Sequence, residues 1–376
     1  MEQLDQLQFS HPAWIEVDLQ QFKQNIRAIK QYIGQCKFCL PIKANAYGHG
    51  LIPIAKAAVE ENIDYLGVSC LQEGALLRDA GIQIPILVMG AIHEQQIEEL
   101  LNYQLEFTIS SLYKAKITAE KCIQLQQKGK VHVEVDTGMQ RTGVRPDSAI
   151  DLLNYLYSMK CFEVVGLYSH LATGDSPNND IAKDQIRVFQ QFTKQYTSKQ
   201  GKNILCHLSN SGGVCYYPEA HMDMVRPGLL AFGYFPRSSN KLLQTIEPFF
   251  SIKAKISYFK VVGKNQGISY GHTYITNKET RIVTVPVGYG DGFRRALSNC
   301  GEIIIRDKRY PIIGTICMDQ FMVDIDHNEA YVGDVVTLIG KENKTQITLE
   351  EIANLCDTIP YEILCGFNDR LPRFYK

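Results

Sequence analysis

The segment Phe38-Cys39-Leu40-Pro41-Ile42 is the first of eight short apolar runs along the first two-thirds of the chain. Short runs rich in β-branched and aromatic residues are typical of strands buried on both faces of a parallel sheet. Amphipathic helices are predicted between most of them, as over 19–33, where Asp18 can cap the start and Gly34 can end the helix. Further helices are expected over 54–61, 147–159 and 182–199, and the other seven apolar runs cover 65–68, 86–89, 107–109, 131–135, 164–168, 204–208 and 224–226.

Eight strands at this spacing predict an N-terminal (β/α)8 barrel, the TIM-like form of the α/β class. A doubly wound sheet is the alternative, although no glycine fingerprint opens its first helix. After about residue 240 the helical periodicity fades, and short β-rich runs between turn residues predict a mostly-β domain. Residues 236–240 are the expected junction, which gives a barrel domain over 1–240 and a C-terminal β domain over 241–376. The β-rich runs cover 249–262, 281–285, 303–305, 322–324 and 335–339.

The charge balance restricts the possible binding partners, and the cysteine content indicates the cellular compartment. The 376 residues carry 39 Lys+Arg against 40 Asp+Glu, so no excess charge favours binding to nucleic acid or to an anionic membrane. Residues 1–5 do not resemble a secretory signal, and no apolar stretch reaches the roughly 18 residues of a spanning helix. Cys36 and Cys39 have CxxC spacing, but Cys39 lies in a predicted strand. These two are therefore expected to be ordinary core thiols, and the eleven scattered cysteines do not resemble a disulfide framework, which fits a reducing cytoplasm.

Polar residues follow several of the predicted barrel strands. Lys43, His170 and Arg226 each stand at or just after the end of an apolar run, as do Asn210 and Ser211. The carboxyl ends of barrel strands meet at one face, where active sites are built. Any one of these residues could be a solvated loop residue, but their convergence favours a site. A lysine that is partly desolvated at a strand end has a lowered pKa and suits Schiff-base chemistry.

The sequence around Lys43 is a more specific indication of function than the position of Lys43 at the end of a strand. Residues 40–50, Leu-Pro-Ile-Lys-Ala-Asn-Ala-Tyr-Gly-His-Gly, resemble the cofactor-lysine motif of alanine racemases, which are pyridoxal-phosphate enzymes built from a barrel and a β domain. The resemblance implies that Lys43 binds pyridoxal phosphate covalently. It extends over nearly the whole chain, through residues 136–143, 168–172, 207–211, 225–229, 268–274, 286–292, 317–319 and 359–362.

The resemblance also implies a role for each site residue. Arg141 would lie near the cofactor's phenolic oxygen and the substrate carboxylate, in a segment where Gln140 replaces the family's common Asn. Arg226 would meet the pyridine nitrogen, with His170 beside the ring. The other cofactor contacts would be Tyr47, Asn210, Ser211, Gly228, Leu229 and Tyr361, most of them on the phosphate. No metal is implied.

Two bases on opposite faces of the substrate are needed for racemisation, and the resemblance assigns them to Lys43 and Tyr270. Tyr270, the entrance residue Tyr289 and the substrate-binding Met318 would complete the site of a neighbouring subunit, which implies a homodimer. A hydrogen-bonded chain from Tyr270 through His170 to Arg226 is our hypothesis for activating the phenol, with both latter groups as cations.

One position departs from the family in an informative way. Several relatives have a carbamylated lysine near the arginine, where this chain has Glu134. We hypothesise that Glu134 orients Arg141 directly; the alternative is a glutamate on the outward face of its strand.

The implied activity is the interconversion of L- and D-alanine, which would supply D-alanine for peptidoglycan synthesis. A serine or broad-specificity racemase is the alternative within this class, although Tyr361 would narrow the floor of the site. A basic amino acid decarboxylase of the same fold fits less well, because Arg226 cannot protonate the ring. A non-catalytic pyridoxal-phosphate carrier would leave residues 241–376 without a purpose.

Overall fold

The computed structural model describes residues 11–200, 204–234 and 243–376. The expected junction at 236–240 lies outside the described residues. The chain forms two compact units. The barrel unit comprises Gln21–Ala46 and Leu51–Glu247, and the β unit comprises the described residues up to Gln20, together with Tyr47–Gly50 and Pro248–Lys376.

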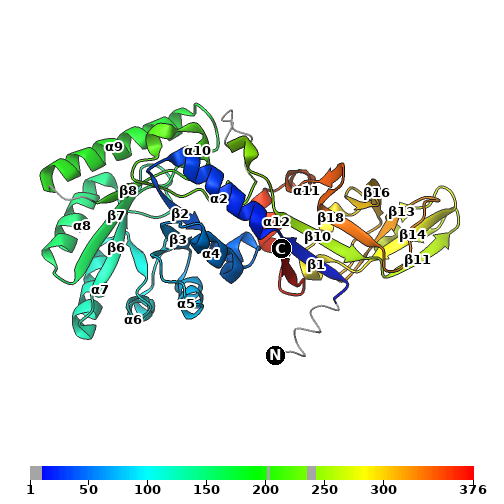
Figure 1. Ribbon diagram of the computed structural model, residues 1–376, viewed down its shortest axis with the longest axis horizontal. Helices are drawn as coiled ribbons and strands as arrows, with labels where there is room; N and C mark the ends of the chain where they lie inside the picture. Colours follow the sequence, from blue (N-terminus) through cyan, green and yellow to red (C-terminus); the bar gives the residue numbers. More distant parts are fainter. Residues whose placement is uncertain (1–10, 201–203, 235–242) are drawn as a thin grey trace. The chain divides into compact units, whose positions relative to one another are not determined.

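The barrel unit contains a closed, eight-stranded parallel barrel in which each strand pairs with the next along the chain and β9 pairs with β2 (Figure 1). The eight apolar runs are its strands, so the predicted barrel is confirmed and the doubly wound alternative is wrong. The strands are β2 (Lys37–Pro41), β3 (Tyr65–Val68), β4 (Ile86–Val88), β5 (Glu106–Ile109), β6 (Gly129–Glu134), β7 (Phe162–Tyr168), β8 (Leu205–His207) and β9 (Met224–Val225).

Helices lie outside these strands, as Figure 1 shows for α7, α8 and α9. The first, α2, covers the predicted residues: Asp18 Oδ1 accepts a hydrogen bond from Gln20 N at 2.9 Å, and Gly34 ends the helix with a φ of 63°. The helices are α2 (Leu19–Ile33), α4 (Leu51–Glu60), α5 (Leu71–Asp79), α6 (Ile97–Asn102), α7 (Leu112–Leu125), α8 (Pro146–Ser158), α9 (Asp180–Gln200) and α10 (Ser211–Tyr216).

The β unit is built on a ten-stranded sheet with the order β11-β14-β17-β16-β15-β18-β10-β1-β20, in which β19 also pairs with β18. The predicted mostly-β domain is confirmed, although the run 249–262 divides into two strands with different partners. The strands are β1 (Ala13–Val17), β10 (Phe250–Lys255), β11 (Tyr258–Val262), β14 (Thr280–Val285), β15 (Glu302–Ile305), β16 (Lys308–Ile313), β17 (Phe321–Asp324), β18 (Val335–Glu342), β19 (Thr345–Ile347) and β20 (Arg373–Tyr375), besides the separate pair β12 (Gly267–Ile268) and β13 (Tyr274–Ile275).

Three elements of the β unit, one strand and two helices, could not be predicted from the sequence. Strand β1 precedes the barrel in sequence, yet it pairs antiparallel with β10 and parallel with β20. Two short helices, α11 (Leu349–Leu355) and α12 (Pro360–Gly366), interrupt the strand-rich region. Thr348 caps α11 by accepting a hydrogen bond from Glu351 N, and Pro360 occupies the first turn of α12, where its missing N–H costs nothing.

The cysteines are all free thiols, as expected. Cys39 is fully buried in β2, and burial raises the pKa of its thiol to about 12, which does not suit a redox pair with Cys36. No helix among the described residues combines the length and apolarity that a membrane span requires.

Candidate functional site

The carboxyl ends of neighbouring barrel strands bring the predicted barrel residues together. Strands β7, β8, β9 and β2 are consecutive around the barrel. Arg226 directly follows β9, and Lys43 and His170 each follow their strands by two residues, while Asn210 and Ser211 come just after β8. The charges of Arg226, Arg141 and Lys43 all act on the His170 ring, which places these cations around one histidine.

A left-handed turn follows Lys43 immediately. Ala44, Asn45, Ala46 and Tyr47 have φ between 51° and 54°, a conformation that costs L-residues roughly 1–2 kcal/mol each. Such strain persists only where surrounding contacts fix it. Glu73 on α5 provides one of them, since its Oε1 accepts a hydrogen bond from Ala44 N at 2.6 Å. Glu73 could not be predicted from the sequence, because a glutamate on an amphipathic helix has the pattern of a solvated residue.

Arg226 is buried and held by several acceptors of the barrel unit. Its Nη1 donates to His207 Nδ1 at 2.7 Å, and its Nη2 donates to the Ser169 carbonyl at 2.7 Å. Nη2 also lies 3.4 Å from His170 Nδ1 and 3.3 Å from the Leu208 carbonyl. The guanidinium lies over the Tyr168 ring at 5.2 Å from its centroid. Its orientation is therefore fixed by neighbouring strands rather than by a carboxylate partner.

His170 is a neutral group in this environment. Burial lowers the pKa of its imidazole to about 3, and the charges of Arg226, Arg141 and Lys43 act in the same direction. The hypothesis that His170 is a cation in the chain to Tyr270 is therefore wrong, and Arg226 is the charged member.

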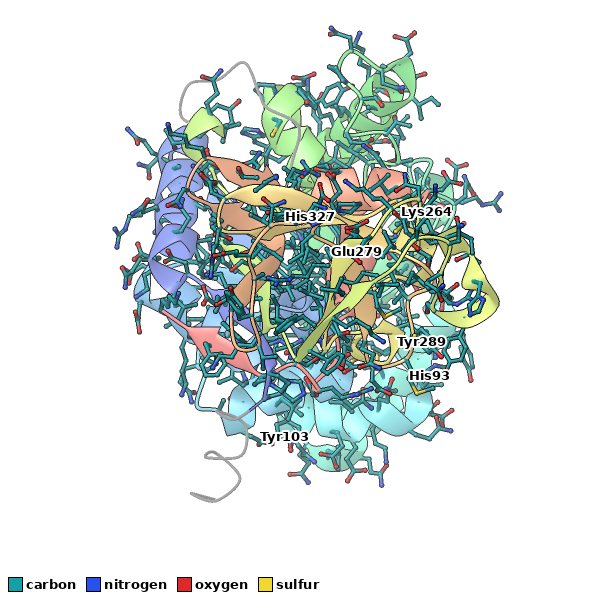
Figure 2. All side chains as sticks on the ribbon, turned by 90° about the vertical axis from the view of Figure 1, so that its right-hand side faces the viewer. His93, Tyr103, Lys264, Glu279, Tyr289 and His327 are labelled. Carbon is teal, nitrogen blue, oxygen red and sulfur yellow. The ribbon has the colours of Figure 1, made fainter. Side chains whose placement is uncertain are left out.

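The low pKa of His170 predicts a pH dependence of stability. Between about 3 and the ordinary histidine value of 6.5, the unfolded state binds one more proton at this site than the folded state. The free energy of unfolding should thus fall as pH drops below 6.5, and His170→Asn should reduce that slope by up to about one proton. Urea unfolding from pH 4.5 to 7.5 measures the slope. His327→Asn, at an exposed histidine of the β unit (Figure 2), is the control, and an unchanged slope in His170→Asn would contradict the prediction.

Residues after β8 and β9 form a cradle suited to an anion. Asn210 caps α10 by accepting from Gly213 N at 3.0 Å, and Ser211 Oγ accepts from Leu230 N at 3.1 Å. Gly228 and Leu229 are buried, and in the described part of the chain no acceptor receives their N–H groups. Buried N–H groups are almost always paired, so two adjacent unpaired ones fit a bound anion such as phosphate.

Glu134 is buried, and Tyr168 and the charges of Arg226 and Arg141 act on its carboxyl, so the alternative of an outward-facing glutamate is wrong. Burial raises the pKa of its carboxyl, while a hydrogen bond from Thr142 and the charges of Arg226 and Arg141 lower it. Among the described side chains no hydrogen bond joins Glu134 to Arg141, which is exposed. Any effect of Glu134 on Arg141 is thus electrostatic, or is transmitted by Thr142, the residue next to Arg141.

The remaining predicted residues lie in the β unit. Tyr47 is buried, and its ring centroid lies 5.7 Å from that of Tyr361. Tyr270, Tyr289 (Figure 2) and Met318 are 73%, 44% and 53% exposed. Gly290 N donates to the Met318 carbonyl at 2.8 Å, so the segments of Tyr289 and Met318 are directly joined. Large apolar side chains with this exposure suit a surface that another chain covers.

Comparison with known proteins gives matches to alanine racemases over both parts of the chain. The alanine racemase N-terminal domain matches residues 17–236, and the alanine racemase C-terminal domain matches residues 249–375. Alanine racemase 2 of Caldanaerobacter subterraneus subsp. tengcongensis is 39% identical over 97% of this chain and 95% of its own, and the alanine racemase of Nostoc sp. is 38% identical over 97% and 96%. A solved structure of alanine racemase from Clostridium difficile 630 superposes with a TM-score of 0.92 at 33% identity, covering 98% of this chain and 96% of that one.

Both parts of the chain match the same family, and the match in sequence and in structure extends over nearly its whole length. The chain therefore belongs to the alanine racemase family.

Proposed function

We propose that the chain interconverts L- and D-alanine with pyridoxal phosphate as its cofactor. The observation that carries this proposal is the composition of the barrel's carboxyl end. A half-buried lysine, Lys43, can bind an aldehyde covalently, and the buried cation of Arg226 acts on the same histidine, His170, as Lys43 does. The unpaired N–H groups of Gly228 and Leu229 suit a phosphate, so the donor set fits the cofactor at each of its ends.

Two residues of the chain would each carry out one of the two proton transfers. When bound, pyridoxal phosphate withdraws electron density from the substrate Cα and makes its proton acidic. Lys43 Nζ would take or return that proton on one face, and the Tyr270 hydroxyl would do so on the other. Arg141 would bind the substrate carboxylate, with the Met318 N–H as a second donor. Arg226 would keep a permanent cation at the pyridine nitrogen, because a guanidinium does not lose its proton at accessible pH.

A homodimer is part of the proposal, with Tyr270 and Met318 acting in the site of the partner chain. The exposure of both side chains supports this arrangement. We further propose a cytoplasmic enzyme whose D-alanine is consumed in peptidoglycan synthesis.

The direct test is incubation of the purified protein and pyridoxal phosphate with L-alanine, followed by chiral chromatography. We expect D-alanine to accumulate until the two enantiomers are equal. L-serine, supplied separately, tests the alternative of a broader racemase. Cofactor binding without formation of either D-amino acid would contradict the proposal and favour a carrier.

Glu134 gives a second test, because a carboxylate needs no carbamylation. Activity should be the same in bicarbonate-free buffer and with added bicarbonate. Glu134→Gln removes a buried negative charge near Arg141 and should raise the KM for alanine by about tenfold, equivalent to about 1.4 kcal/mol. Glu163→Gln, at an exposed glutamate on the neighbouring strand β7, is the matched control. Stimulation by bicarbonate, or an unchanged KM in Glu134→Gln, would refute the role.

A further inference from the structure

A line of four hydrogen-bonded side chains runs through the interior of the barrel and ends at Arg226. Arg226 Nη1 lies 2.7 Å from His207 Nδ1, and His207 Nε2 lies 3.0 Å from His132 Nδ1. His132 Nε2 in turn lies 2.9 Å from Glu106 Oε2. Both histidines are fully buried, and Glu106 is 5% exposed.

The positions of these side chains show that the line crosses the barrel core. Glu106 lies at the first residue of β5, His132 within β6 and His207 at the last residue of β8. Tyr65 on β3 meets the His132 ring edge-on, with the ring centroids 6.2 Å apart. Barrel interiors are usually filled by branched apolar side chains, and a buried polar network is costly unless every member is satisfied.

Neighbouring residues are shaped to accommodate the line. Gly166 on β7 leaves the space that His132 occupies, since a Cβ at this position would lie 2.3 Å from His132 Nδ1. The Tyr168 ring stacks on His207 at 4.9 Å with an interplanar angle of 15°. These contacts hold both imidazoles in the plane and direction that the hydrogen bonds require.

The two ends of the line permit one arrangement of protons. A guanidinium can only donate, so His207 Nδ1 must accept and the neutral His207 carries its proton on Nε2. That proton is donated to His132 Nδ1, which leaves the His132 proton on Nε2, facing Glu106. Glu106 Oε2, 2.9 Å away, is placed to accept that proton, so the geometry at the opposite end agrees with this direction. Burial and the charge of Arg226 lower the pKa of His207 well below the ordinary value, consistent with a neutral ring.

We propose that Glu106 is a positioning residue of the active site: as the terminal acceptor, it fixes His132 and His207 as Nε2–H tautomers and so keeps His207 Nδ1 as the acceptor that aims Arg226. The importance of the Arg226 orientation for catalysis rests on the proposed function, whereas the arrangement of protons on the two histidines does not. Without an acceptor at position 106, the Nε2–H of His132 is buried and unpaired. The other tautomer of His132 would set its Nδ1–H against the Nε2–H of His207, so either state disrupts the line.

The first measurement is the tautomeric state of the histidines in the full-length protein with 15N-labelled histidine. Signals of His132 and His207 are assigned by their loss in His132→Gln and His207→Gln. We expect both residues to be protonated on Nε2 alone, with Nδ1 as an unprotonated nitrogen. A proton on Nδ1 of either ring would overturn the proposal. This readout involves neither alanine nor the cofactor, so it stands even if the racemase assay fails.

The second measurement compares two variants of position 106. Glu106→Gln keeps an acceptor oxygen and should preserve both tautomers, with kcat close to that of the unchanged protein. Glu106→Leu removes the acceptor. It should lower kcat about 10–100-fold, the range typical for the loss of a group that orients an active-site residue. The KM for alanine should change little. Glu106→Leu should also change the nitrogen signals of His132, either because the Nε2–H loses its hydrogen bond or because the ring changes to the other tautomer.

Glu163→Leu, which removes an exposed carboxylate from β7, is the matched control. Glu106→Leu could lose activity through unfolding. The positioning role is therefore decided by the kcat of Glu106→Gln and by the histidine tautomers measured in the unchanged protein. Full kcat together with unchanged tautomers in Glu106→Leu would refute the positioning role. A loss of kcat in Glu106→Gln as large as in Glu106→Leu would also refute it, because charge rather than acceptance would then be the requirement.

Discussion

Replacing Lys43 by alanine is expected to reduce the formation of D-alanine by at least about 10⁴-fold, the upper range for loss of a positioned acid–base group. The side chain would lose two roles at once, because the same Nζ would bind the cofactor and transfer a proton. Its position depends on the left-handed turn that follows it and on the hydrogen bond from Ala44 N to Glu73. The measurement is chiral chromatography of the products from L-alanine under saturating substrate.

Two variants separate this role from a general effect of charge. Lys43→Arg keeps the cation but cannot bind an aldehyde covalently, so it should be as inactive as Lys43→Ala. Lys37→Ala removes an exposed lysine at the opposite end of the same strand and should leave activity unchanged. Racemisation by Lys43→Arg at more than a few per cent of the normal rate would show that Lys43 has another role.

Substituting Arg226 should change the outcome of the reaction as well as its rate. Arg226→Glu introduces a carboxylate that can keep the pyridine nitrogen protonated, which strengthens the cofactor as an electron sink. We expect racemisation to fall about 10²–10³-fold, the range for loss of one preorganised donor, and the ratio of pyruvate to D-alanine to rise as transamination competes. Product analysis by chromatography gives both quantities.

The same substitution should also destabilise the barrel. The carbonyls of Ser169 and Leu208 and the Nδ1 of His207 would lose their donor, and a carboxylate cannot replace it. The free energy of unfolding should decrease on the order of 3 kcal/mol, measured by urea unfolding. Arg226→Lys keeps the cation with fewer donors and should lose rate without gaining transamination. An unchanged product ratio in a folded Arg226→Glu protein would refute the assignment of Arg226.

Much of the barrel could be predicted because its strands are buried on both faces and are separated by amphipathic helices. The predicted and observed strands differ by only one or two residues at their ends. Strand β1 could not be assigned in this way, because its partners β10 and β20 are remote in sequence and pairing leaves no local signal. The short helices α11 and α12 were missed because seven residues hold too few turns for a clear periodicity.

The site could be predicted where a polar residue stands at the end of a strand, as Lys43 and Arg226 do. Glu106 and His132 were missed because they lie at or within apolar runs, where alternation suggests that a polar side chain faces outward. In a barrel packed on both faces it can also face the interior, and only the structure shows that His132 and Glu106 meet there. The protonation state of His170 could not be predicted either, because the ring is neutral as a result of burial, which the sequence does not reveal.

The pairing of β1 with β20 has a consequence for how the chain folds during synthesis. Glu16 and Phe374 are register partners, so one of the first ordered strands must wait for residues at the far end of the sequence. The barrel strands, by contrast, all lie between residues 37 and 225 and can close earlier, since domains tend to fold as they leave the ribosome. We therefore expect the barrel unit to become compact while β1 is still unpaired. The sheet of the β unit, which relies on contacts across more than 350 residues, should form last and set the slow step of folding.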